Sequence, residues 1–119
     1  MKREEFDHYC SSLKSASHVV QWRAASVWKI GGKIFAIHPD LGEGQEHKFS
    51  FKCSDLSYQI LCELADIIPA PYLARAKWVQ VTTAEALSDD DLRAYIKTAY
   101  DIISRKLTKA IQMELGLYG

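Results

Sequence analysis

The sequence lacks the features that mark membrane-spanning, disulfide-rich and metal-binding proteins. None of its apolar runs approaches the roughly 18 residues that cross a bilayer, and its charged start contains no apolar secretion signal. Its 3 cysteines, an odd number, have no metal-ligand spacing among themselves or with the 4 histidines. We therefore expect a cytoplasmic chain with reduced thiols, no metal, no cofactor and no membrane partner.

The sequence also lacks a net charge, with 15 Lys and Arg residues against 15 Asp and Glu residues. Residues 1–60 carry 8 basic and 7 acidic side chains, and residues 61–119 carry 7 and 8, so neither half is polarised. Domains that bind nucleic acid tightly are usually basic, so this balance argues against high affinity but leaves room for a local basic face. Its 119 residues, 48% hydrophobic, suffice to bury one core, and we expect a single domain over 1–119.

A pair of glycines between two β-forming runs predicts a tight hairpin over residues 27–37. Gly31 and Gly32 suit its loop because glycine tolerates positive φ angles. A regular register then pairs Trp28 with Phe35, and side chains alternate between the two faces of the hairpin. The face that we expect in the core carries Trp28, Ile30, Phe35 and Ile37. The outward face carries Val27, Lys29, Ile34 and Ala36.

The remaining patterns predict an α+β fold with a mostly antiparallel sheet and helices packed on one face, in the order α-β-β-β-β-α-β-α. Outside the hairpin, the predicted strands cover residues 18–22, 47–52 and 77–82. The predicted helices cover residues 3–14, 54–68 and 88–107. Ser54 and Ser88 are expected to cap the last two helices. The expected buried stripe of helix 54–68 is Leu61, Leu64, Ala65 and Ile68, supported by Leu56 or Ile60.

Strict alternation places several lysines on the outward side of this sheet. In strand 47–52, Lys48 and Lys52 point away from the apolar face, to the side that also carries Lys29. Trp78 joins them if strand 77–82 turns its valines inward. An exposed aromatic ring among ammonium groups can stack on a base or lie beside a phosphate. The alternative is a solvated sheet face kept soluble by lysine, with Trp78 covered by a loop such as residues 72–76.

No combination of residues in the sequence indicates catalysis, and we expect a protein that is not an enzyme. Cys10 and Cys62 lie on or near apolar helical stripes, which favours inert thiols over a nucleophile. The acids at 89–91 follow the capping Ser88, where negative charge suits the start of a helix. Capping therefore explains this acidic run better than metal binding does.

Two stretches resemble the MmcQ/YjbR-like family. Residues 27–36, VWKIGGKIFA, are similar to the family's "vfkvggKiFa" core, and residues 69–79, PAPYLARAKWV, are similar to its most distinctive segment. The likeness extends over most of the chain, from about Phe6 to Lys109. One departure is Ala99, which stands where the family usually has serine.

The resemblance implies a frataxin-like (CyaY-like) α+β fold, also described as a double-wing arrangement, and a DNA-binding role without catalytic residues. We therefore predict weak, salt-sensitive DNA binding by a monomer. The residues expected to bind DNA are Lys29, Lys48, Lys52, Arg75, Lys77 and Trp78. The alternative is an adaptor for a protein or small ligand with no nucleic-acid role, which predicts an apolar groove near Tyr72, Trp78 and Tyr100.

Overall fold

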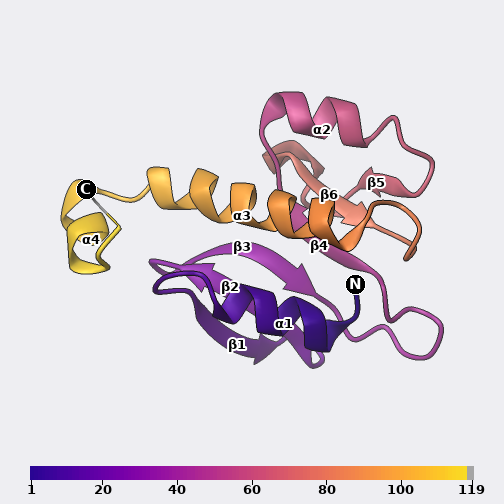
Figure 1. Cartoon of the computed structure of the whole chain (residues 1–119), viewed down its shortest axis with the longest axis horizontal. Coiled ribbons are helices and arrows are strands. Elements are labelled where there is room, and N and C mark those ends of the chain that lie inside the picture. Colours follow the sequence, from indigo (N-terminus) through magenta and orange to yellow (C-terminus); the bar gives the residue numbers. More distant parts are fainter. Residues whose placement is uncertain (118–119) are drawn as a thin grey trace.

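A computed structural model describes residues 1–117 as a six-stranded antiparallel sheet with helices packed against it (Figure 1). The strand order across the sheet is β1-β2-β3-β4-β6-β5. The elements in chain order are α1 (Arg3–Ser11), β1 (Ser17–Gln21), β2 (Ala25–Ile30), β3 (Lys33–His38), β4 (Phe49–Lys52), α2 (Asp55–Leu61), β5 (Ile67–Pro69), the 3-10 turn η1 (Ala74–Ala76), β6 (Trp78–Val81), α3 (Asp89–Arg105) and α4 (Lys109–Glu114). The predicted α+β class and antiparallel sheet are confirmed, and β5 and α4 are additions to the predicted order.

The core lies between the sheet and the two helices α1 and α3, which cross the same side of it in Figure 1. Phe6 and Cys10 of α1 are fully buried, as their spacing in the sequence predicts. Leu92 and Ile96 of α3 join them against the aromatic side chains of β3 and β4. Within residues 1–117, no helix is long and apolar enough to cross a membrane.

The β2–β3 hairpin keeps its predicted glycine turn but not its predicted register. The two pairs next to the turn are as expected, and a bulge then inserts Phe35, so that Trp28 faces Ala36. A bulge adds one residue to one strand and exchanges the faces of the residues beyond it. Ala36, expected on the outward face, is therefore buried in the core, while Ile37 is outside the core cluster and half-buried.

The segment after β4 also differs from the prediction. Ser54 caps α2 as expected, accepting a hydrogen bond from the backbone N–H of Ser57 at 3.1 Å. The helix ends at Leu61, however, because residues 67–69 form β5 and pair with β6. Leu61 and Ile67 then fill the core. Three side chains expected to be buried are exposed: Leu64, Ala65 and Ile68.

The C-terminal part contains two helices where the sequence suggested one. Ser88 caps α3, accepting from the Asp91 N–H at 3.1 Å, as predicted. The helix ends at Arg105, and Thr108 then caps α4 in the same way. The Gln112 side chain donates to two backbone carbonyls at the end of α3, which holds the short helix against the longer one.

Candidate functional site

The outward side of the sheet carries three of the residues predicted to bind DNA. Lys52 faces Trp78 across the β4–β6 pair, and the neighbouring Val79 and Val81 point into the core. Lys29 lies on the side of β2 opposite the buried Trp28. The predicted direction of Lys29, Lys52 and Trp78 is therefore confirmed.

The expected exposure of two of these residues is wrong. Only 6% of Trp78 and 9% of Lys52 are exposed, because residues 70–77 fold against this end of the strands. The Trp78 N–H donates to the Leu73 carbonyl at 3.3 Å, and the Lys52 ammonium group donates to the Ala76 carbonyl. The Trp78 ring is not available to stack on a base, and the structure matches the alternative in which a loop covers it.

The other three predicted residues do not complete a single patch. Lys48 precedes β4 and lies at the end of the sheet opposite the β2–β3 turn, since β3 and β4 are antiparallel. Arg75 is exposed on η1. Lys77 is half-buried, with its ammonium nitrogen 4.9 Å from the centre of the Tyr58 ring on α2. The prediction of one continuous basic sheet face is therefore wrong.

The β2–β3 turn packs against the segment that follows α3. Gly31 has a φ of +59°, and a Cβ atom at this position would lie 2.6 Å from Leu107 Cδ1. At Gly32, with a φ of +81°, a Cβ atom would have no neighbour within 4 Å. The hairpin tip and the end of α3 thus form one end of the molecule, although they are far apart in the sequence.

Basic side chains gather at this end of the molecule. We define the basic end as Lys29, Lys33, Lys52, Lys77, Arg105 and Lys106. Burial lowers the pKa of Lys52, and the nearby positive charges of Lys106 and Lys77 lower it further, while Asp55 opposes them. Within residues 1–117, none of the six forms an ion pair. Lys33, Arg105 and Lys106 are exposed, so their positive charges can attract an anionic ligand, whereas Lys52 is buried.

Acidic side chains gather at the opposite end, where α1 and α3 begin (Figure 1). The first turn of α1 contains Glu4 and Glu5, and the first turn of α3 contains residues 89–91, all aspartate. Burial lowers the pKa of the Met1 amino group, and the charges of Asp89 and Glu5 oppose this shift, so both acids lie near it. The neutral chain is thus polarised from end to end.

The sequence contains a signal for this separation of charge. Counting the charges in each half of the chain does not reveal it. Residues 8–39, which include β1, β2 and β3, carry 4 Lys and Arg side chains and no Asp or Glu. Residues 102–113 carry 3 Lys and Arg side chains and no Asp or Glu. Two acid-free stretches that meet in the fold produce the basic end, and a sliding window of charge would have detected each of them.

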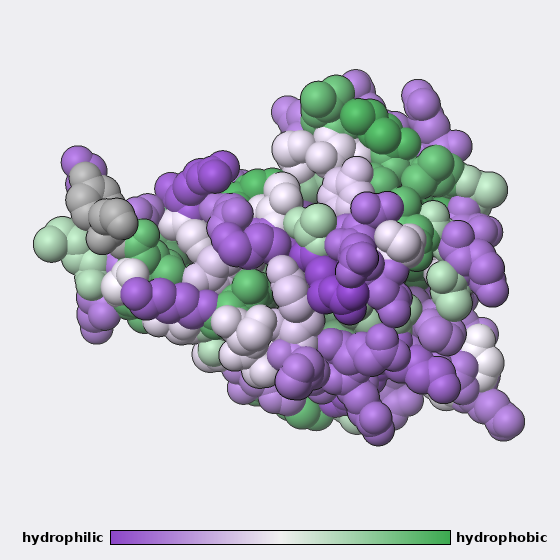
Figure 2. Space-filling model, viewed as in Figure 1, coloured by the Kyte–Doolittle hydropathy of each residue, from purple (hydrophilic) through white to green (hydrophobic). Residues whose placement is uncertain are grey.

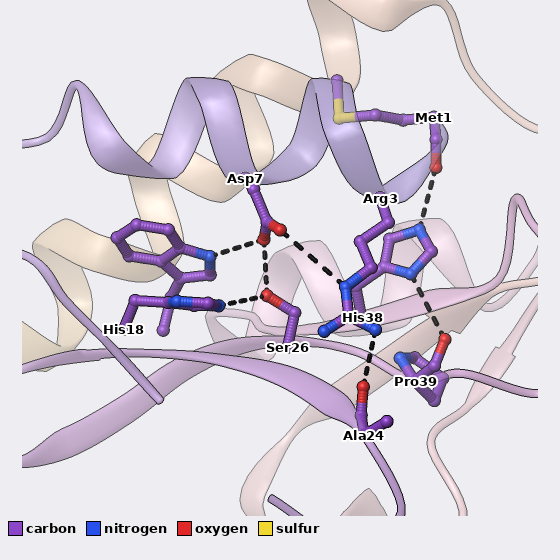
Figure 3. Close-up of polar contacts among 9 residues, drawn as sticks. Met1, Arg3, Asp7, His18, Ala24, Ser26, His38 and Pro39 are labelled. Carbon is purple, nitrogen blue, oxygen red and sulfur yellow. Dashed lines mark hydrogen bonds and ion pairs between the residues drawn. The ribbon is translucent and has the colours of Figure 1, made fainter. Parts of the chain in front are cut away.

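A hydrogen-bonded network joins α1 to β2 (Figure 3). The Ser26 hydroxyl donates to Asp7 Oδ1 at 2.5 Å and lies 2.7 Å from His18 Nε2. Trp28 Nε1 donates to the same carboxylate oxygen at 2.8 Å, and Arg3 Nε lies 3.8 Å from Asp7 Oδ2. Ser26 is fully buried, and its hydroxyl donates its hydrogen bond to Asp7 instead of His18. This arrangement anchors a helix and does not activate a nucleophile.

His38 makes a second buried polar contact at the start of α1 (Figure 3). Its Nε2 lies 3.1 Å from the Met1 carbonyl oxygen and its Nδ1 3.3 Å from that of Pro39. A neutral imidazole has one N–H and can donate to only one of these oxygens. Burial lowers the pKa of His38, although both carbonyl contacts oppose this shift.

Burial disfavours the thiolate form of the three cysteines. Burial raises the pKa of the Cys53 thiol to about 12 and also raises the pKa of Cys10 and Cys62. A protonated thiol is a poor nucleophile and a poor metal ligand. Within residues 1–117, no group of three or more His, Cys, Asp and Glu side chains is placed to hold a metal ion.

The apolar groove predicted by the adaptor hypothesis is not formed. Tyr100 lies on the helix side of the sheet, its ring edge-on to Phe35 with the ring centres 5.6 Å apart. Trp78 points to the outward side, and Tyr72 is fully exposed. The rings of Tyr100 and Trp78 therefore lie on opposite sides of the sheet.

The geometry thus defines an α+β domain with an antiparallel sheet and oppositely charged ends. The YjbR family description matches residues 11–102, and the chain belongs to the YjbR family, as its sequence motifs predict. Its fold is similar to the crystal structure of the Deinococcus radiodurans protein DR2400, which has a DUF419 domain, with a TM-score of 0.86. That similarity covers 98% of this chain and 88% of that chain at 21% identity, and so concerns the fold alone. A comparison with curated proteins finds no significant match.

Proposed function

We propose that this protein binds nucleic acid through its basic end, as a binding protein without catalytic activity. The observation that carries the proposal is the basic end, where Lys33, Arg105 and Lys106 are exposed and none of the six basic side chains is in an ion pair within residues 1–117. Lysine and arginine side chains that neutralise phosphates release counterions, and this release drives much of nucleic-acid binding.

The buried state of Trp78 determines the kind of contact that we expect. The buried Trp78 ring offers no stacking surface, and the ammonium and guanidinium groups of the basic end recognise phosphates and carry no sequence information. The acidic end repels a polyanion. The chain therefore approaches nucleic acid with its basic end, and we expect weak binding with little sequence preference.

A fluorescence anisotropy titration with labelled single-stranded and duplex DNA tests the proposal. We expect a Kd of roughly 10⁻⁴ to 10⁻⁶ M at physiological salt, the usual range for non-specific binding. Binding should tighten as the salt concentration falls. A flat anisotropy signal at low salt, up to roughly 10⁻⁴ M protein, would rule the proposal out.

Charge-reversal variants test which surface binds. The double variant Lys33→Glu, Lys106→Glu reverses two exposed charges of the basic end. We expect its Kd at low salt to be at least about tenfold higher than that of the wild type. Lys48→Glu makes the same kind of change at the opposite end of the sheet and serves as the matched control. If Lys48→Glu weakens binding, per charge reversed, as much as the double variant does, the basic end is not the binding surface.

A further inference from the structure

A cavity of about 310 Å³ lies between α3, α4 and the segment that follows α1. The segment after α1 contributes Lys14 to its lining, α3 contributes Lys97 and Arg105, and the residues after α4 contribute Gly116. In Figure 1, α4 lies at one end of the long helix α3. Cavities that hold small molecules in proteins begin at roughly 300 Å³, so this one has room for a small ligand and not for a folded partner.

Hydrogen bonds between distant parts of the chain fix the walls of this cavity. The Tyr100 hydroxyl on α3 donates to the Lys14 carbonyl oxygen at 2.6 Å, and the Ser15 hydroxyl donates to the Leu115 carbonyl oxygen at 2.8 Å. The Gln112 side chain ties α4 to the end of α3. The three walls are thus joined to one another without a ligand, and a site that is already formed loses less free energy in ordering when a ligand binds.

The absence of a side chain at Gly116 leaves room for the Lys14 side chain. Gly116 has a φ of +74°, and a Cβ atom at this position would lie 3.0 Å from Lys14 Cε and 3.1 Å from Lys14 Nζ. Within residues 1–117, Lys14 forms no ion pair. Its ammonium group therefore lies at the cavity with no acidic partner.

Positive charge exceeds negative charge around the cavity. Its lining contains three basic side chains and one acidic one: Lys14, Lys97, Arg105 and Asp101. Lys97 Nζ donates to Asp101 Oδ1 at 2.7 Å, and Arg105 forms no ion pair in the part of the chain that the structure describes. Figure 2 shows hydrophilic residues over the end of α3, in contrast to the hydrophobic residues gathered over α2. The two unpaired positive charges favour an anionic ligand.

We infer that this cavity binds a small organic molecule that carries a phosphate monoester. A phosphate monoester has roughly 1.5 to 2 negative charges at neutral pH, which matches the excess positive charge of the lining. The guanidinium group of Arg105 can bind two phosphate oxygens at once. A single carboxylate would neutralise only one of the two unpaired charges. The inference goes beyond the proposed function because the ligand is a small molecule, and Arg105 is the one residue that the cavity shares with the basic end.

A titration with ribose 5-phosphate in the absence of nucleic acid tests the inference. We expect a Kd of about 1 mM or lower at low salt, with changes in the backbone amide signals of Lys14 and Gly116 in nuclear magnetic resonance spectra of the isotope-labelled chain. Ribose without the phosphate is the matched ligand and should leave these signals unchanged.

Three variants test whether the charges of the cavity hold the phosphate. Lys14→Gln removes one unpaired positive charge and should raise the Kd for ribose 5-phosphate at least about fivefold. Asp101→Asn removes the acidic side chain of the lining and should lower that Kd about threefold, a gain that a poorly folded variant cannot produce. Lys33→Gln removes an exposed charge of the basic end outside the cavity and should change that Kd by less than about twofold.

Three results would overturn the inference. The first is the absence of binding up to about 10 mM ribose 5-phosphate at low salt, and the second is an equal response to ribose. The third is a Kd that neither Lys14→Gln nor Asp101→Asn changes, because the phosphate would then bind elsewhere. The DNA titration of the proposed function responds to Lys33 and Lys106, which do not line the cavity, so the two proposals can fail separately.

Discussion

The junction between α1 and β2 and the basic end both concentrate polar side chains, but only the junction sets acidic groups against their partners. At the junction, one carboxylate oxygen of Asp7 accepts from both Ser26 and Trp28. At the basic end, six cationic side chains lie together, and within residues 1–117 none has an ion-pair partner. Buried polar groups that satisfy one another stabilise a fold, whereas unpaired surface charges are available to a ligand. The first region should therefore respond to mutation in stability and the second in binding.

Asp7→Ala should produce the largest change in stability. It leaves the Trp28 indole N–H without its acceptor and leaves the buried Ser26 hydroxyl with only the His18 ring nitrogen beside it, at a cost of about 2–4 kcal/mol in the free energy of unfolding. Chemical denaturation measures this difference. Glu4→Ala, on an exposed position of the same helix, should change the free energy by no more than about 0.5 kcal/mol. A similarly small effect at Asp7 would mean that the network does not hold α1 to the sheet.

Alanine at the two turn glycines should distinguish local strain from packing at the basic end. Both glycines have positive φ, so both substitutions cost about 1–2 kcal/mol. At Gly31 the added methyl also collides with Leu107, which should cost about 1–3 kcal/mol more. The measurement is the difference between the unfolding free energies of Gly31→Ala and Gly32→Ala. Equal values would show that the hairpin tip does not pack on the segment after α3.

His38, at the end of β3, should make the stability of the fold depend on pH. Because burial lowers its pKa, the unfolded chain takes up a proton near pH 6.5 while the folded chain stays neutral to a lower pH. The free energy of unfolding should therefore fall as the pH drops below 6.5, by at most about 1.4 kcal/mol per pH unit from this group. His38→Gln should reduce that slope, and His8→Gln, on an exposed position, should not. Identical slopes for wild type and His38→Gln would contradict this role.

Local sequence rules correctly predicted which side of the sheet these side chains point to, but they did not predict how far the side chains are exposed to solvent. Alternation correctly turned Lys29, Lys52 and Trp78 outward because facing depends on neighbours along the strand. Their exposure depends on what lies above them, and residues 70–77 cover Trp78 through contacts that no local pattern contains. The bulge at Phe35 was missed because residues 34–37 are all apolar, so their pattern does not show which of them face the core.

The α2 segment and the basic end were missed for two different physical reasons. A four-residue apolar spacing fits a buried helical face and an exposed interaction face equally well, so Leu64 and Ile68 could not be placed from the sequence. The basic end forms only when the hairpin meets the end of α3, through the contact between Gly31 and Leu107. Charge totals for each half of the chain are balanced and do not show that these two segments meet.

The salt dependence of DNA binding tests the central claim most directly. Each phosphate neutralised contributes a slope of about −0.9 to the plot of log K against log salt concentration. We predict a slope of about −2 to −4 for the wild-type chain, and a slope shallower by about 1–2 for Lys33→Glu, Lys106→Glu. A slope near zero for the wild type, or the same slope for both proteins, would contradict the claim that the unpaired charges of the basic end bind nucleic acid.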